Sequence, residues 1–234
     1  MHKIDPLNVD ELVAYVFDIQ HGGSVDLFRE AFSEPIQEIC GSVKECYLGF
    51  LQFEKHEAPD ERFLHLTAHI YALVEALYTS VKLLAHGFLA PSGNQFRVAL
   101  EAMAVSVLLS HPGDLLLEKR PNKWVSRSFY ADFAKDKRWT LPHLAIKTLD
   151  KNREQIGLSE QAMKLLSATK DIYNKYSHSS RLSIRAIVVA PDRVLFGGGY
   201  EHEQEPLFAK ELEIRSGFIE KVPSFLTTLY KRVA

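Results

Sequence analysis

The segment from Phe96 to Leu108 is apolar on nearly every side of the helix that it would form. Its apolar residues are Phe96, Leu100, Met103, Ala104, Val107 and Leu108. A helix of this kind must be covered by other elements all round, so it belongs at the centre of a bundle. Ser92-Gly93-Asn94-Gln95 predicts a capping box, in which Gln95 reaches back to the Ser92 amide. His111-Pro112-Gly113 is expected to end the helix.

The rest of the chain predicts further helices, because apolar residues recur at spacings of three and four. The longer ones are expected at about Asn8 to Gln20, Ser33 to Phe53, Asp60 to His86, Ser159 to Ser177 and Phe208 to Arg232. Two shorter ones are expected at about Trp124 to Lys137 and Pro142 to Arg153. Ser33 is a suitable N-cap, and Pro223 should kink or break the last helix. The expected fold class is therefore mainly all-α, a multi-helix bundle.

Residues 183–198 change in character and predict a β-hairpin. Ser183 to Val189 is rich in β-branched residues, and Pro191 and Asp192 suit a type I turn before Val194-Leu195-Phe196. One hairpin of this size is not stable alone, so we expect it to lie against the bundle. The whole chain, residues 1–234, is then expected to be a single helical domain with the hairpin inserted before its last helix.

Composition is typical of a globular protein and excludes several classes. Apolar residues make up 46% of the chain and charged residues 25%, which is enough for a sizeable core. No apolar run reaches the roughly 18 residues that span a bilayer, and the first residues lack the regions of a signal peptide. We therefore expect a cytoplasmic protein with no membrane partner. The formal net charge of −2 argues against a general nucleic-acid-coating protein but permits a local basic groove.

The chain has two cysteines, Cys40 and Cys46. Their spacing places them far apart around a helix, so an internal disulfide is not expected. A zinc cluster is not expected either, because the chain has no second cysteine pair. We expect both side chains to be buried as small hydrophobic groups, and we expect no cofactor.

The segment Tyr173-Asn174-Lys175-Tyr176-Ser177-His178 is the strongest candidate for catalytic chemistry. Asn174 and His178 lie one helical turn apart and share a face. Such a pair can hold an imidazole in one tautomer and present it to a phosphate or a hydroxyl group. The alternative is a histidine favoured at a helix C-terminus by the helix dipole.

The order of helices, the central Arg97-Val98-Ala99-Leu100-Glu101 and the late Asn174-x-x-x-His178 resemble the HEPN superfamily (higher eukaryotes and prokaryotes nucleotide-binding domains). The resemblance covers about residues 30–232 and is greatest to uncharacterised bacterial branches. It implies a homodimer whose active members are metal-independent endoribonucleases. It also implies RNA as a partner, in a toxin, stress or phage-defence setting, with His178 and Asn174 as catalytic residues.

The superfamily motif has an arginine immediately before its polar residue, and here that position is Tyr173. The arginine would stabilise negative charge that develops on the phosphate, which a tyrosine cannot do. Arg181, Lys175 or Lys170 is a candidate substitute. The departure favours weak or absent nuclease activity, and Tyr173→Arg is expected to raise it.

Three further groups of residues are candidates for a site. Arg97 and Glu101 lie four residues apart on the apolar central helix. They are expected to form either an intrahelical ion pair or a pocket wall that orients His178. Glu61, His65 and His69 have a spacing that can bind a metal, although a solvated or partner-facing polar stripe explains them better.

The third group is a stretch, residues 118–138, in which basic and aromatic residues alternate. It contains seven Lys or Arg residues against three acidic ones. The residues expected to contact nucleic acid are Lys123, Trp124, Arg127, Lys137 and Arg138. This composition suits single-stranded nucleic acid, through attraction to the backbone and stacking of bases. An amphipathic connector with core aromatics has the same composition.

Three functions stay open from the sequence. The first is a HEPN-like protein that binds RNA or cuts it with His178. The second is a catalytically silent bundle that serves as an interaction module. The third is a helical enzyme that binds a metal or a small molecule. The tyrosine at the position of the motif arginine, Tyr173, favours a weak or silent RNA-binding module over an active nuclease.

Overall fold

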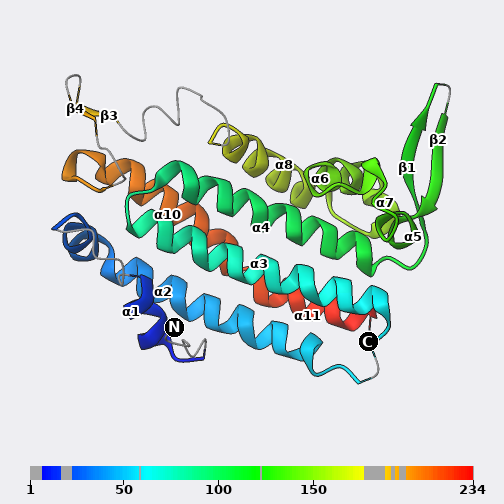
Figure 1. Cartoon of the computed structure of the whole chain (residues 1–234), viewed down its shortest axis with the longest axis horizontal. Coiled ribbons are helices and arrows are strands. Elements are labelled where there is room, and N and C mark those ends of the chain that lie inside the picture. The colour runs from blue at the N-terminus through cyan, green and yellow to red at the C-terminus, as the bar shows by residue number, and fades with distance from the viewer. Residues whose placement is uncertain are drawn as a thin grey trace.

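A computed structural model describes residues 7–16, 23–57, 59–121, 123–176, 188–190, 193–194 and 199–233. The fold is mainly all-α, as predicted, with long helices lying roughly along one another (Figure 1). The long helices are α2 (Gly23–Glu54), α3 (Glu61–Ala85), α4 (Leu89–Ser110), α8 (Glu160–Asn174), α10 (Glu205–Ile219) and α11 (Val222–Val233). The shorter ones are α1 (Val9–Val16), α5 (Phe129–Phe133), α6 (Pro142–Lys151) and α7 (Arg153–Ile156). The strands are β1 (Asp114–Arg120), β2 (Lys123–Ser128), β3 (Val188–Ala190) and β4 (Arg193–Val194).

Helix α4 lies at the centre, as its all-round apolar surface predicts. It contacts α3, α6, α8 and α11, and Ala99, Leu100, Ala104 and Leu108 are fully buried. The last two helices, α10 and α11, run along α2 behind the α3–α4 pair (Figure 1). The chain therefore returns at its end to cover the elements it formed first. No helix among the described residues has the length and apolar character needed to cross a membrane.

Helix α2 begins earlier than predicted. It starts at Gly23 rather than Ser33 and is kinked at Phe32, which has φ −130° and ψ 19°. Val25, Phe28 and Phe32 form a buried stripe at spacings of three and four. This packing adds a helical segment before Pro35, which then lies just after the kink. Residues 17–22, where the first predicted helix was expected to end, lie outside the described residues.

The predicted capping box at Ser92 is wrong. Helix α4 begins at Leu89, so Ser92 lies within its first turn, and its hydroxyl donates to the Ser80 carbonyl over 2.6 Å. The turn before α4 is set by Gly87, which has a φ of 73°. A Cβ atom at Gly87 would lie 2.1 Å from the carbonyl oxygen of Gly199, so only glycine fits.

The helix predicted at Trp124 to Lys137 is also wrong over its first part. Strands β1 and β2 pair as an antiparallel hairpin, with Asp114 opposite Ser128 and Arg120 opposite Lys123. Leu115 and Leu117 are buried at the alternate positions of a strand. Only Phe129–Phe133 is α-helical, capped by Ser128, whose hydroxyl accepts from the Ala131 amide.

Other predicted elements are present. Asp60 caps α3 by accepting from the Phe63 amide over 2.7 Å. Within the predicted late hairpin, Val188 pairs with Val194 and Ala190 pairs with Arg193. Residues 183–187, 191–192 and 195–198 lie outside the described residues. The last predicted helix is broken into α10 and α11, with Pro223 in the first turn of α11, where its missing N–H costs nothing.

Candidate functional site

The two motif residues that can be placed, Tyr173 and Asn174, face different surroundings. Asn174 is the last residue of α8 and lines a surface pocket together with Arg97. Tyr173 is fully buried in the core. His178 and Arg181 lie outside the described residues, so the predicted histidine–asparagine pair stays a prediction.

Tyr173 belongs to a buried polar network formed with α10. Its hydroxyl donates to Glu211 Oε2 over 2.9 Å, and the Tyr176 hydroxyl donates to Glu211 Oε1 over 2.6 Å. Arg215, which is also fully buried, forms an ion pair with Glu211 and lies 3.2 Å from the Tyr173 hydroxyl. Burial raises the pKa of both tyrosines above the ordinary range, so they stay neutral donors.

Helix α4 closes this network from the other side. Arg215 Nη2 donates to the Ser92 hydroxyl over 2.7 Å. A Cβ atom at Gly93 would lie 2.6 Å from the Tyr176 ring, so this glycine allows the ring to approach the helix. No sequence pattern singles out Glu211 and Arg215, because an ion pair four residues apart on a helix is usually solvated.

Arg97 and Glu101 form the intrahelical ion pair on α4, at a distance longer than a hydrogen bond. Arg97 Nη1 lies 3.7 Å from Glu101 Oε1, and Arg97 Nη2 donates to Asn94 Oδ1 over 3.1 Å. The two side chains are 25% and 10% exposed. Arg97 Nε is buried and has no hydrogen-bond partner among the described residues. The pair therefore lies at the edge of the core.

Arg97 contributes to a pocket among α4, α6 and α8 with a volume of about 480 Å³. Its lining residues are Arg97, His143, Leu144, Ile146, Lys147, Ser167, Lys170, Asp171 and Asn174. We call this the cationic pocket. Lys170 is buried and donates to the His143 carbonyl over 2.5 Å. Burial lowers the pKa of Lys170, Glu101 raises it, and the nearby positive charges of Lys147 and Arg97 lower it further.

A larger pocket, of about 680 Å³, lies between the β1–β2 hairpin and α6. We call it the tryptophan cleft. It is lined by Leu117, Glu118, Lys119, Trp124, Arg138, Trp139, Leu144, Lys147, Thr148 and Lys151. The Lys151 ammonium lies 3.4 Å from the centre of the Trp124 ring, and Trp124 is 41% exposed. Trp139 Nε1 donates to Asp132 over 2.8 Å, which fixes the orientation of the second indole.

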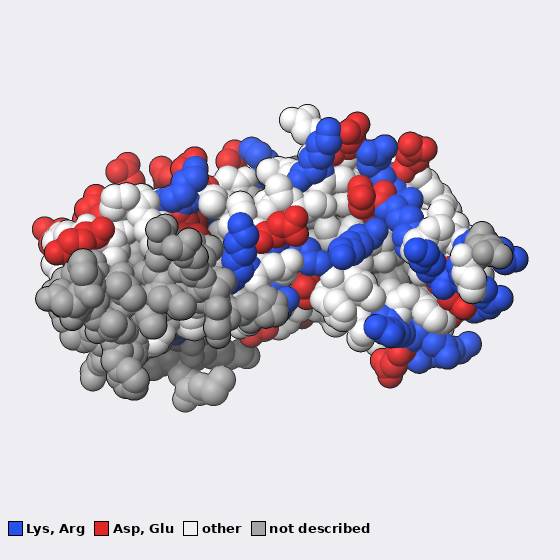
Figure 2. Space-filling model, turned by 90° about the horizontal axis from the view of Figure 1, so that it is seen from above, with Lys and Arg blue, Asp and Glu red and all other residues white. Residues whose placement is uncertain are grey.

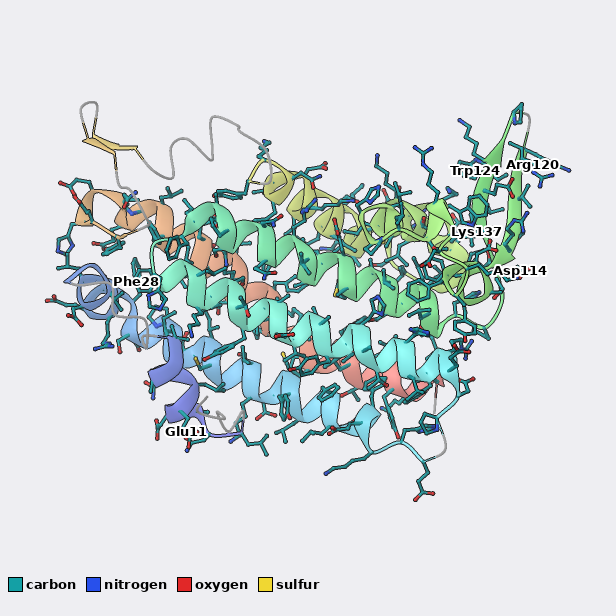
Figure 3. All side chains as sticks on the ribbon, in the orientation of Figure 1. Glu11, Phe28, Asp114, Arg120, Trp124 and Lys137 are labelled. Atoms are coloured by element: carbon teal, nitrogen blue, oxygen red, sulfur yellow. The ribbon has the colours of Figure 1, made fainter. Side chains whose placement is uncertain are left out.

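The five residues predicted to contact nucleic acid lie in different settings. Trp124 and Arg138 line the tryptophan cleft. Lys123 and Lys137 are exposed near it, and Arg127 is bonded to Glu118 over 2.9 Å. Lys and Arg side chains gather over this end of the molecule (Figure 2), and Arg120, Trp124 and Lys137 lie on or beside the hairpin (Figure 3).

The sequence reasoning missed Lys147 and Lys151, which supply two cations to the cleft from α6. They lie four apart and so share a helix face with Leu144. That spacing was the available indication, but lysines on a short amphipathic helix are usually solvated. Only the packing of the hairpin against α6 turns this face into a cleft wall.

The histidine pair on α3 has an aromatic setting. His69 Nδ1 donates to the His65 carbonyl over 2.8 Å, and both rings lie about 5.5 Å from the Phe133 ring. Burial lowers the pKa of His69, which favours its neutral form. Within the described ranges, no three His, Cys, Asp or Glu residues are grouped so that they could hold a metal ion. Cys40 and Cys46 are buried and unbridged.

Comparison with known proteins gives no family for this chain: no family model, no curated protein and no solved structure matches it. The site must therefore be interpreted from its own geometry.

Proposed function

We propose that this chain is a HEPN-like module that binds single-stranded RNA in the tryptophan cleft and has weak or no nuclease activity. The observation that carries the proposal is the composition of the cleft. Two indole rings and four cations line it together: Trp124, Trp139, Lys119, Arg138, Lys147 and Lys151. Bases stack on aromatic rings, and lysine and arginine attract the backbone phosphates. Both kinds of contact tolerate different sequences, so binding of RNA strands with little sequence preference is expected.

The charge of the cleft supports this proposal although the whole chain is slightly acidic. Glu118 is the carboxylate among its lining residues, and it is already bonded to Arg120 and Arg127. Hydrogen bonds from these two arginines lower the pKa of Glu118, and the bond from Arg120 has the larger effect. Glu118 therefore stays ionised and holds both cations beside the cleft. The other cations of the cleft are then left to face a bound phosphate backbone.

Weak catalysis is supported by the position of Tyr173. The residue that takes the place of the motif arginine is buried against Glu211 and Arg215. It therefore cannot contact a phosphate that lies outside the core. Without a cation at that position, charge that develops in the transition state would lack its stabilising partner.

The experiment is RNA binding by fluorescence anisotropy, with a labelled strand of about ten nucleotides. Trp124→Ala should weaken binding by about 1–3 kcal/mol, the value of one stacked base. Lys151→Ala should weaken binding and make the dependence on salt less steep, because one phosphate contact is lost. Lys210→Ala is the matched control, since Lys210 is exposed on α10 and pairs only with Glu213. Equal affinities for all four proteins would contradict the proposal.

The homodimer is part of the same proposal. Leu165 and Ile172, seven residues apart on α8, are 67% and 39% exposed. Residues at this spacing share a helix face, and a second copy would cover them. Light scattering at micromolar concentration should give twice the mass of one chain, and Leu165→Glu should reduce it. A single-chain mass for the unaltered protein would contradict this part of the proposal.

A further inference from the structure

The cationic pocket brings three positive side chains together from three helices. Arg97 comes from α4, Lys147 from α6 and Lys170 from α8. Asp171 is the carboxylate on the lining, and it is exposed. Glu101 lies behind Arg97 at 3.7 Å. Positive side chains that line one pocket repel one another, so the pocket favours a bound anion.

Two of these cations have donor capacity left for a ligand. The Lys170 ammonium has three hydrogens and donates to one carbonyl, that of His143. Arg97 Nε is buried without a hydrogen-bond partner, and the contact of Arg97 with Glu101 is too long to be a hydrogen bond. A buried donor without a partner is costly, and an anionic oxygen would satisfy it.

The remaining lining residues restrict the kind of anion. Ser167 and Asn174 provide neutral polar groups, whereas Leu144 and Ile146 form an apolar part of the wall. The polar side suits several oxygens of one tetrahedral group, and the apolar side suits the carbon part of an ester. Donors from three cations can bind separate oxygens of one phosphate group, which suits a phosphate monoester better than a carboxylate.

We propose that the cationic pocket binds a phosphate monoester, held by Arg97, Lys147 and Lys170. This inference does not rest on RNA binding in the tryptophan cleft. The two sites nevertheless adjoin, because Leu144 and Lys147 line both. The phosphate can therefore come from the 5′ end of an RNA strand in the cleft or from a small phosphorylated molecule.

The first arm of the test uses phenyl phosphate, a monoester without a nucleoside, in isothermal titration with the full chain. Binding is expected, and phenol should not bind. Lys170→Met and Arg97→Ala should each weaken phenyl phosphate binding about tenfold or more, since each removes a charge-assisted hydrogen bond. Lys147→Glu tests the same site at an exposed position that does not endanger the fold. Lys210→Ala should bind like the unaltered protein.

The second arm identifies the source of the phosphate. If a 5′-phosphorylated strand binds more tightly than a 5′-hydroxyl strand, and Lys147→Glu removes this difference in affinity, the pocket is assigned to the RNA end. Equal binding of the two strands, together with phenyl phosphate binding, would assign it to a small molecule. The proposal is overturned if phenyl phosphate does not bind, or if it binds Lys147→Glu as well as the unaltered protein. Trp124→Ala should leave phenyl phosphate binding unchanged, which separates this test from that of the cleft.

Discussion

The hydroxyl of Tyr173 lies 2.9 Å from Glu211 Oε2, and this hydrogen bond joins the end of α8 to the middle of α10 inside the core. Arg215 completes the group by pairing with Glu211 and approaching the faces of Phe96 and Tyr173 at 5.3 and 5.4 Å. The position that the HEPN resemblance gives to a catalytic arginine is thus occupied by a residue that holds two helices together.

Glu211→Ala should destabilise the protein by about 3–5 kcal/mol, because it leaves the buried guanidinium of Arg215 without a counter-charge. Urea unfolding followed by circular dichroism measures the change. Glu213→Ala is the control on the same helix, since Glu213 is 70% exposed and pairs with Lys210. Its effect should stay within about 0.5 kcal/mol. Similar midpoints for the two variants would show that the network does not stabilise the fold.

Tyr173→Arg should destabilise the protein rather than restore a nuclease. The new guanidinium would lie in the core beside Arg215, and Glu211 cannot neutralise both. The burial of Tyr173 therefore argues against the rise in activity that the motif alone predicts for this variant. Tyr173→Phe should cost only about 1 kcal/mol, because Tyr176 and Arg215 still bond Glu211. Melting temperatures of the two variants test the prediction, and a Tyr173→Arg protein as stable as the original would refute it.

Arg97 and Glu101 should be energetically coupled, by about 1–3 kcal/mol in a double-mutant cycle with alanine. The value is lower than for a fully buried pair because Arg97 is 25% exposed and the contact is 3.7 Å. Glu160 and Lys164 form the matched control, since they have the same spacing but are 61% and 75% exposed. That pair should couple by about 0.3–0.5 kcal/mol. Equal coupling in both cycles would place Arg97 and Glu101 in solvent.

Cleavage of RNA should be weak or absent, and any activity should persist in EDTA. The proposed mechanism uses His178 as general acid or base and Asn174 to hold it, with no metal ion. His178→Ala should then abolish measurable cleavage, since a positioned proton-transfer group contributes about 10²–10⁴-fold. Gel analysis of labelled RNA tests this. Strong cleavage that EDTA leaves intact and His178→Ala removes would reverse the weak-activity proposal, whereas cleavage stopped by EDTA would exclude the mechanism.

Cys40 and Cys46 should resist thiol reagents in the folded protein and react at once in urea. Burial raises the pKa of each thiol from its ordinary value near 9 to about 12, so almost no thiolate exists at pH 8. Between pH 9 and 12 the unfolded chain loses these protons and the folded one keeps them. The free energy of unfolding should therefore fall as pH rises through that range. Rapid labelling of the native protein at pH 8 would contradict this.

The helices that could be predicted from the sequence are those whose pattern is purely local. The stripe of α3, with Leu66, Ile70, Leu73 and Leu77, correctly predicts a helix from about Asp60 to His86. The same reasoning failed at residues 124–128, where interleaved aromatic and basic residues fit a helix as well as a strand. Pairing across the hairpin decides that segment, and such pairing is not visible in a local pattern.

The candidate site was predicted in part for the same reason. Trp124 and Arg138 were found because aromatic and basic residues lie close together in the sequence. Lys147 and Lys151 were not placed in a site, because each needs a neighbouring element to form a pocket wall. Lys170 was named only as a candidate substitute for the motif arginine. Arg215 and Ser92 lie 123 residues apart, so only the folded structure joins them.

The separation of Ser92 and Arg215 has a consequence for how the protein is made. A ribosome adds about 5–20 residues per second, so α4 emerges roughly 6–25 seconds before the guanidinium that it will bond. During that interval the surfaces of α2 and α3 that α10 and α11 will cover stay open, and the turn at Gly87 lacks its contact with Gly199. The core of this bundle is therefore completed only after α10 and α11 have been synthesised, and the surfaces that they cover stay exposed until then.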